Sequence, residues 1–196
     1  MFDLDYCSYP DCKKKVRTGS RLCEDHQSWQ SVEHFSSLMT EKDLIGDIKA
    51  PGLTFKNLDL RNKRFIDCYF HHTQWINCHF DRSIFQMCFF DESVFMDTSF
   101  TKVNMKHCVF TDSVMTNIDW HGSDLISVNL NNIHAVNNNF SESDLYYSRF
   151  IAAYLKDVKM IDCNLKRVDF SASQRKGVNF KYSNTAEAYF DTEEIQ

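Results

Sequence analysis

The sequence is poor in glycine and proline, with five and two among its 196 residues. Glycine supplies the left-handed backbone of many tight turns, so a fold rich in turns would have to build them from other residues. No apolar run reaches the ~20 residues that a membrane helix needs. The first residues, Met1 to Asp5, lack the basic and apolar regions of a secretory signal. We therefore expect no membrane partner, a cytoplasmic location and reduced thiols.

An excess of one charge sign is also missing. The chain has 22 Lys and Arg against 27 Asp and Glu, a formal net charge of -5. This balance alone predicts neither general nucleic-acid affinity nor strong acidic mimicry of nucleic acid.

A period of five residues dominates the chain from Phe55 to Phe190. Of the 28 positions there with numbers divisible by five, 25 hold Phe, Leu, Met or Trp, and 14 of the 17 phenylalanines fall in them. The exceptions are Ala135, Arg175 and Thr185. Two positions earlier, 22 of 28 residues are Ala, Ser, Thr, Cys or Val. The repeat is therefore small-x-large-x-x.

This period excludes a regular helix or a flat strand. Five residues advance a helix by about 500°, so the large residues would share no face. In a flat strand an odd period alternates faces. One set can be buried only if the chain bends once per repeat, with the small and large residues both pointing inward.

The segments Ser123-Asp124-Leu125 and Val128-Asn129-Leu130 carry the motif most clearly. They resemble the pentapeptide-repeat family, whose pattern is Ala-Asp/Asn-Leu-x-x. The resemblance implies an all-β repeat fold, a right-handed quadrilateral β-helix with four bends per coil. At twenty residues per coil, the span predicts about seven coils.

The N-terminal segment, residues 1–27, has the ligand spacing of a zinc site. Its Cys7, Cys12, Cys23 and His26 form a C-x4-C-x10-C-x2-H pattern. Zinc binds four such ligands tetrahedrally, and so short a polar segment needs a metal to hold it together. We expect one structural Zn²⁺; the alternative is incidental thiols and a surface histidine. The loop also carries lysines, which could contact phosphate or simply be solvated.

Residues 28–50 predict a helical cap over the first coil. Apolar residues recur at three- and four-residue spacing: Trp29, Val32, Phe35, Leu38 and Met39. Thr40 with Asp43 resembles the start of a second short helical segment. Pro51-Gly52 then breaks the chain, so we expect the β-helix over 51–190 and a short tail over 191–196.

Two of the four predicted walls differ from the rest in what they expose. One should present an apolar protein-binding patch of Ile76, Val94, Met96, Val114, Val136 and Tyr154. Another should present an acidic wall of Asp91, Glu92, Asp112, Asp169 and Asp191. The buried cysteines should act as small apolar residues, and we expect no catalytic residues.

Three functions remain open at this point. A non-enzymatic protein-binding scaffold fits a rigid rod with an apolar patch. The resemblance also implies an alternative, because some pentapeptide-repeat proteins mimic DNA and protect gyrase, a topoisomerase. A third possibility is nucleic-acid recruitment through the basic zinc segment.

The C-terminal coil should leave an open edge near Tyr189 and Phe190. Only six residues follow, too few for a stable helical cap. Exposed strand edges tend to pair with another chain, which predicts a homodimer through this coil.

Overall fold

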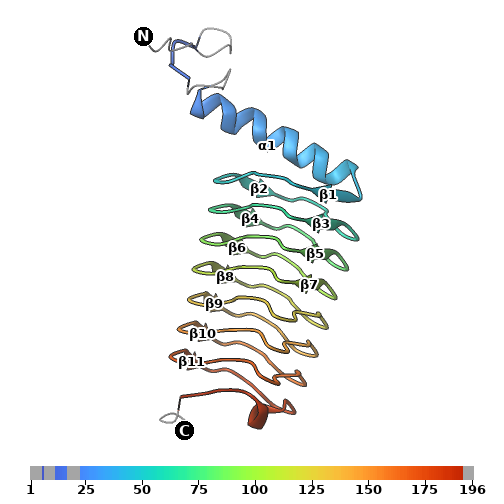
Figure 1. Ribbon diagram of the computed structural model, residues 1–196, viewed down its shortest axis with the longest axis vertical. Coiled ribbons are helices and arrows are strands. Elements are labelled where there is room, and N and C mark those ends of the chain that lie inside the picture. The colour runs from blue at the N-terminus through green and yellow to red at the C-terminus, as the bar shows by residue number, and fades with distance from the viewer. Residues whose placement is uncertain (1–5, 7–11, 17–22, 192–196) are drawn as a thin grey trace.

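In a computed structural model the chain forms one helix followed by a stack of coils (Figure 1). The structure describes residues 6, 12–16 and 23–191, and for residues 24–31 the backbone alone. Helix α1 spans Glu24–Glu41, and a short 3-10 helix, η1, spans Thr185–Glu187. The strands are β1 Leu44–Gly46, β2 Thr54–Lys56, β3 Arg64–Ile66, β4 Gln74–Ile76, β5 Ile84–Gln86, β6 Val94–Met96, β7 Asn104–Lys106, β8 Val114–Thr116, β9 His134–Val136, β10 Tyr154–Lys156 and β11 Gln174–Lys176.

Each coil has four sides and takes twenty residues. One side is a parallel sheet in the order β1-β3-β5-β7, and another is a seven-stranded parallel sheet in the order β11-β10-β9-β8-β6-β4-β2. The register places Phe65 opposite Phe85. Single parallel bridges, such as those between Tyr69 and Phe89 and between His79 and Ser99, form the other two sides. The predicted all-β repeat of about seven four-sided coils is confirmed.

The corners are built largely without glycine, as the composition requires. The second residue after each large one has a positive φ, for example His72 (55°) and Glu92 (55°), and glycine holds this place at Gly52, Gly122 and Gly177. A left-handed conformation costs other residues roughly 1 kcal/mol each. Most corner N–H groups donate to a carbonyl of the next coil, as His72 donates to the Asp91 carbonyl at 3.0 Å. This ladder offsets part of the strain.

Stacked aromatic rings fill the axis of the solenoid. Phe70 and Phe90 stack with ring centroids 5.2 Å apart, and Phe90 and Phe110 stack at 4.9 Å. All three side chains are fully buried. Burial of each such ring contributes roughly 1.5–3 kcal/mol, so these ladders dominate the stability of the coils.

The small inward positions add buried hydrogen bonds. The Ser93 hydroxyl donates to the Phe70 carbonyl at 2.8 Å and accepts the Thr73 N–H at 3.0 Å. Ser113 repeats the arrangement one coil later. A hydroxyl at this position therefore links neighbouring coils, which explains why Ser and Thr share the position with Ala, Cys and Val.

The coils begin earlier than the expected boundary at residue 51. Strand β1 lies in the segment that we expected to be helical, and it pairs with β3. Ile45 and Ala50, both 1% exposed, occupy the two preceding large positions. Ile48, a large residue, fills the small position between them, so the small-x-large-x-x repeat is not recognisable there. Thr40 starts no second helix; its hydroxyl donates back to the Ser36 carbonyl within α1.

Helix α1 covers the N-terminal end of the stack (Figure 1). Met39 is fully buried in the solenoid core, and Val32, Phe35 and Leu38 pack against it. The expected capping role of this amphipathic segment is therefore confirmed, with the helix ending at Glu41. Trp29 lies among the residues whose side chains are not described.

Candidate functional site

The predicted apolar patch lies on one sheet. Its six residues come from β4, β6, β8, β9 and β10, consecutive strands of the seven-stranded sheet. They lie in two adjacent columns, in which Val94 pairs with Val114 and Ile76 pairs with Met96. His134 separates Val114 from Tyr154 in one column, and Thr116 separates Met96 from Val136 in the other. Met96 is 41% exposed and Val114 39%, so both point outward as expected. We call this surface the apolar wall.

Polar groups surround the apolar wall. Along one margin an amide ladder runs between coils: Asn137 donates to Asn117, and Asn117 donates to Asp97, both at 2.8 Å. Lysines stand at both ends of the sheet, at Lys56 in β2 and at Lys156 and Lys176 in β10 and β11. An apolar centre inside a polar rim has the anatomy of a protein–protein interface.

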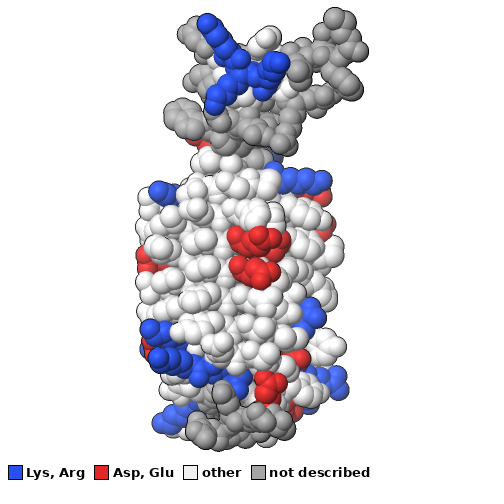
Figure 2. Space-filling view, turned by 90° about the vertical axis from the view of Figure 1, so that its left-hand side faces the viewer, with Lys and Arg blue, Asp and Glu red and all other residues white. Residues whose placement is uncertain are grey.

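The predicted acidic residues form two separate groups rather than one wall. Asp91, Glu92 and Asp112 lie on the corner beside the apolar wall, whereas Asp169 and Asp191 lie coils away. In the corner column, Asn132 and Ala152 separate the groups. Figure 2 views the side with the seven-stranded sheet, where a compact acidic cluster interrupts mainly uncharged coils. Asp169 also stabilises its own turn, because its carboxylate accepts the Ser171 N–H at 2.9 Å.

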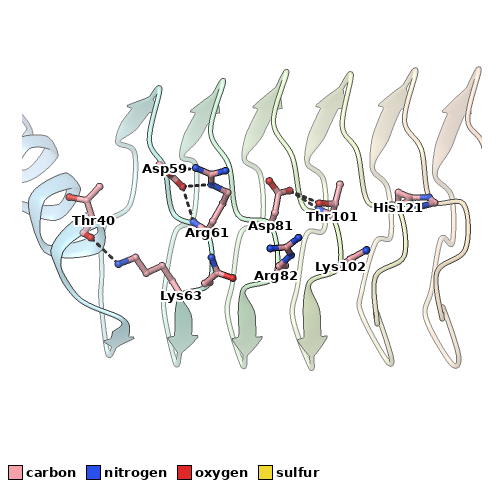
Figure 3. Close-up of a pocket in the computed structure, with 10 residues that line it drawn as sticks. Thr40, Asp59, Arg61, Lys63, Asp81, Arg82, Thr101, Lys102 and His121 are labelled. Carbon is pink, nitrogen blue, oxygen red and sulfur yellow. Dashed lines mark hydrogen bonds and ion pairs between the residues drawn. The ribbon is translucent and has the colours of Figure 1, made fainter.

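A groove of about 690 Å³ opens on another side of the coils, next to the end of α1 (Figure 3). Its walls are strongly charged: Asp59, Arg61, Lys63, Asp81, Arg82, Lys102 and His121 line it with Thr40, Asn62 and Thr101. The sequence interpretation missed this groove. Its signal was the twenty-residue spacing of Arg82 and Lys102, which places two cations on successive corners.

The two carboxylates of the groove have local partners. Asp59 accepts from Arg61 Nε at 2.8 Å, and this hydrogen bond lowers the pKa of Asp59 to about 2. Asp81 accepts from the N–H and hydroxyl of Thr101 at 3.0 and 2.8 Å. Arg82 and Lys102 point along the same groove (Figure 3). The cations of the groove can therefore hold an anionic group of a partner. The hydrogen-bonded pairs that Asp59 and Asp81 form have a structural role.

Family models match the coils directly. Pentapeptide repeats match residues 76–112, and a pentapeptide repeat region matches residues 113–190. Together they cover 37 and 78 residues, or 115 of the 196.

The chain belongs to the pentapeptide-repeat family.

Several solved structures are similar to it. QnrB1, a plasmid-mediated fluoroquinolone resistance protein, is 17% identical, with a TM-score of 0.41 over 76% of this chain and 84% of that one. HetL, involved in heterocyst differentiation regulation in the cyanobacterium Nostoc sp., is 10% identical, with a TM-score of 0.29 over 84% and 98%. A pentapeptide repeat protein of the Arabidopsis thaliana thylakoid lumen is 20% identical, with a TM-score of 0.37 over 50% and 65%. No curated protein matches significantly.

Two of the four predicted zinc ligands lie together in this pentapeptide-repeat protein. The Sγ atoms of Cys12 and Cys23 are 3.8 Å apart. Two thiolates bound tetrahedrally at about 2.3 Å from one zinc ion lie about 3.8 Å apart, so this pair fits the metal. Cys7 and the side chain of His26 lie outside the described residues. Lys13, Lys14 and Lys15 of the intervening loop are exposed.

The cysteines inside the coils are buried thiols. Cys68, Cys88 and Cys108 lie in one column, twenty residues apart. The thiol of Cys108, hydrogen-bonded to Cys88, raises the pKa of Cys88 to about 12, and burial adds to this shift. Burial raises the pKa of Cys163 to about 11. Neutral, enclosed thiols of this kind are unreactive, in line with the small-residue role expected for them.

The C-terminal end of the pentapeptide-repeat protein is partly covered. Phe190 stacks on Phe170 at 5.1 Å, and Tyr189 is 59% exposed. Arg175 and Thr185 break the period, and their sequence predicts irregular last coils; β11, which contains Arg175, still pairs with β10 in register, and the regular pattern ends at η1. Across the described residues, no helix is long and apolar enough to cross a membrane.

Proposed function

We propose that this pentapeptide-repeat protein is a non-enzymatic scaffold that binds a partner protein on its apolar wall. The observation that carries the proposal is that six outward apolar residues, four of them in directly paired positions, lie on five consecutive strands of one sheet. Parallel pairing at every strand makes this surface rigid, so a partner would bind with little loss of conformational entropy in the scaffold.

The four-stranded sheet supports the choice of wall by contrast. It also exposes apolar side chains, Leu44 at 57% and Ile84 at 40%. Strand β3 between them carries Arg64 at the paired position, and β7 carries Asn104 and Lys106. These apolar residues have only polar neighbours in their column, whereas the apolar wall contains two directly paired apolar neighbours, Val94 with Val114 and Ile76 with Met96. Single exposed apolar residues are common, but a contiguous patch favours an interface.

The charges beside the apolar wall indicate which residues a partner should present. Asp91, Glu92 and Asp112 border the apolar wall, because the acidic corner directly precedes β6 and β8. A partner with an apolar centre and basic residues facing this corner would match the surface.

Topoisomerase protection by DNA mimicry is less well supported. Mimicry of a duplex requires acidic groups repeated along the rod, and Asn132 and Ala152 interrupt them here. Nucleic-acid recruitment by the N-terminal segment rests on five basic residues, Lys13, Lys14, Lys15, Arg17 and Arg21, beside a net charge of -5. For that segment, the Cys12–Cys23 distance supports a structural zinc site.

The test is a photo-crosslinker placed at Met96 in the tagged full chain, expressed in its source cell. We expect one dominant crosslinked protein, lost when Val114 is changed to Asp in the same chain. A second experiment pulls down that protein with the double variant Met96→Asp/Val114→Asp. We expect at least a ten-fold loss of binding, because two carboxylates would be buried in the interface.

The control is Ile84→Asp/Met87→Asp, with residues 40% and 44% exposed on and beside β5 of the other sheet. It adds the same charge at matched exposure and should bind like the wild type. Equal loss in both double variants would point to a general charge effect. Unchanged binding by folded Met96→Asp/Val114→Asp would exclude the apolar wall as the binding surface.

A further inference from the structure

One corner of the solenoid places two histidines against two carboxylates. His71 and His72 form the corner before β4, and Asp91 and Glu92 form the corresponding corner of the next coil before β6. The backbone fixes this arrangement, because the His72 N–H donates to the Asp91 carbonyl at 3.0 Å. All four side chains are partly exposed, between 31% for Asp91 and 52% for His72.

The ring nitrogens of these histidines face carboxylate oxygens. His71 Nδ1 is hydrogen-bonded to Asp91 Oδ2. The other nitrogen of the ring, Nε2, lies 4.0 Å from Glu92 Oε1, and His72 Nδ1 lies 3.4 Å from Glu92 Oε2. One ligand atom each from His71, His72 and Glu92 lie within 4.8 Å of one another.

The hydrogen bond to Asp91 has a specific chemical consequence. With Nδ1–H donating to the carboxylate, the neutral His71 ring keeps its lone pair on Nε2, the nitrogen that faces Glu92. Histidines that bind metals in proteins commonly donate their second ring N–H to a carboxylate in this way, which fixes the tautomer and raises the basicity of the ligand. Asp91 therefore prepares His71 to act as a ligand.

We propose that His71, His72 and Glu92 bind a divalent first-row transition metal ion, with Asp91 as the positioning residue for His71. Two imidazoles and one carboxylate suit Zn²⁺, Ni²⁺ or Cu²⁺, whereas Ca²⁺ and Mg²⁺ prefer oxygen ligands alone. Ligands at about 2.0–2.2 Å from one ion lie about 3–3.5 Å apart, so small side-chain rotations at this exposed corner complete the site. The three protein ligands leave positions open for water or a ligand from another molecule.

Other histidines of the coils lack this combination. His121 lies 3.7 Å from Glu142 on a comparable corner, but the residue after it is Gly122. His79 pairs with the Ser99 hydroxyl, and His134 stacks on Tyr154. Only at the 71–72 corner, among the described residues, does a carboxylate face two neighbouring imidazoles. His121 therefore offers a matched control.

The experiment titrates the untagged full chain with Ni²⁺ and follows each histidine ring by NMR. No further Zn²⁺ is added, because we expect the proposed cysteine site to be filled in the protein as purified. Paramagnetic broadening should reach the His71 and His72 rings at a Ni²⁺ concentration at least roughly ten-fold lower than the His34 and His121 rings. His71→Ala and Glu92→Gln should remove this preference, and His121→Ala should leave it unchanged.

The role of Asp91 is tested by Asp91→Asn. Loss of a carboxylate behind a metal-bound histidine typically weakens metal binding by ~10–100-fold, and we expect an effect of this size. Equal broadening of all exposed histidines would overturn the proposal. Preferential broadening that survives both His71→Ala and Glu92→Gln would overturn it as well.

Discussion

The guanidinium carbon of Arg175 lies 5.1 Å from the ring centroid of Phe190, at the C-terminal end of the solenoid axis. Arg175 occupies a position that elsewhere holds a large apolar residue. Its Nη1 donates to the Phe170 carbonyl at 3.1 Å and to the Ser173 hydroxyl at 2.6 Å. An arginine here places charge at the solvent end of the axis and covers the last aromatic ring.

Replacing this arginine should loosen the last coil without unfolding the rest. Arg175→Ala removes two charge-assisted hydrogen bonds and the contact with Phe190, and we expect a loss of about 1–3 kcal/mol. Amide hydrogen exchange should rise in residues 170–191 and stay unchanged in residues 60–120. Lys176→Ala, an exposed neighbour, is the control. Equal exchange in wild type and Arg175→Ala would contradict the capping role.

A second prediction concerns the N-terminal cysteines. Protein purified without added metal should contain about one Zn²⁺ per chain by elemental analysis, because four such ligands form a closed structural site. Cys12→Ser and Cys23→Ser should each remove it. Cys163→Ser changes a thiol buried in the coils and should retain the zinc. A wild-type protein without metal, or zinc retained by Cys12→Ser, would refute the site.

A third prediction concerns Asp124, whose Oδ1 is buried without a hydrogen-bond partner. Its Oδ2 accepts from Asn104 at 2.7 Å, and the Asp144 carboxylate is next in the column. Burial, and secondarily the charge of Asp144, raises the pKa of Asp124 above 3.8. Asparagine could instead donate onward to Asp144, as Asn104 does to Asp124.

Asp124→Asn should therefore stabilise the protein at pH 7 by about 1–3 kcal/mol. The sign follows from the raised pKa, since the fold favours the protonated acid and loses stability as pH rises through that pKa. The gain should shrink as the pH falls through the raised pKa, below which wild-type Asp124 is protonated. Urea unfolding above and below that pKa measures it, with Asp112→Asn, an exposed corner residue, as control. A gain that does not change with pH would contradict this explanation.

The period of five predicted the coils because every repeat has the same environment. Phe70, Phe90 and Phe110 fill one ladder, so their spacing alone reports the geometry. The first coil was hidden by Ile48, a large residue in a small position. The charged groove was missed because its cations lie on different sides of the coils. The period alone does not show how those sides meet at a corner. The apolar wall was found from inward and outward positions alone, but its role as a binding surface depends on a partner.

The last prediction is a homodimer joined through the C-terminal coil. Among the described residues, strand β11 is the outer strand of the seven-stranded sheet, and Tyr189 in the final coil is exposed. A sheet edge at the end of the described coils, together with an exposed aromatic residue, favours pairing with a second copy about a two-fold axis. Arg175 opposes this by covering Phe190, which limits the contact to the edge and Tyr189.

Sedimentation equilibrium at micromolar concentration should therefore give a dimer. Tyr189→Glu should weaken it at least ten-fold, because two carboxylates would meet across the two-fold axis. Phe190→Glu should do the same but also loosen the coil, since Phe190 stacks on Phe170. Tyr147→Glu is the matched control, at 57% exposure against 59% for Tyr189, in the middle of the rod. A wild-type monomer would refute the dimer, and a dimer that resists Tyr189→Glu but not Met96→Asp would place the interface on the apolar wall.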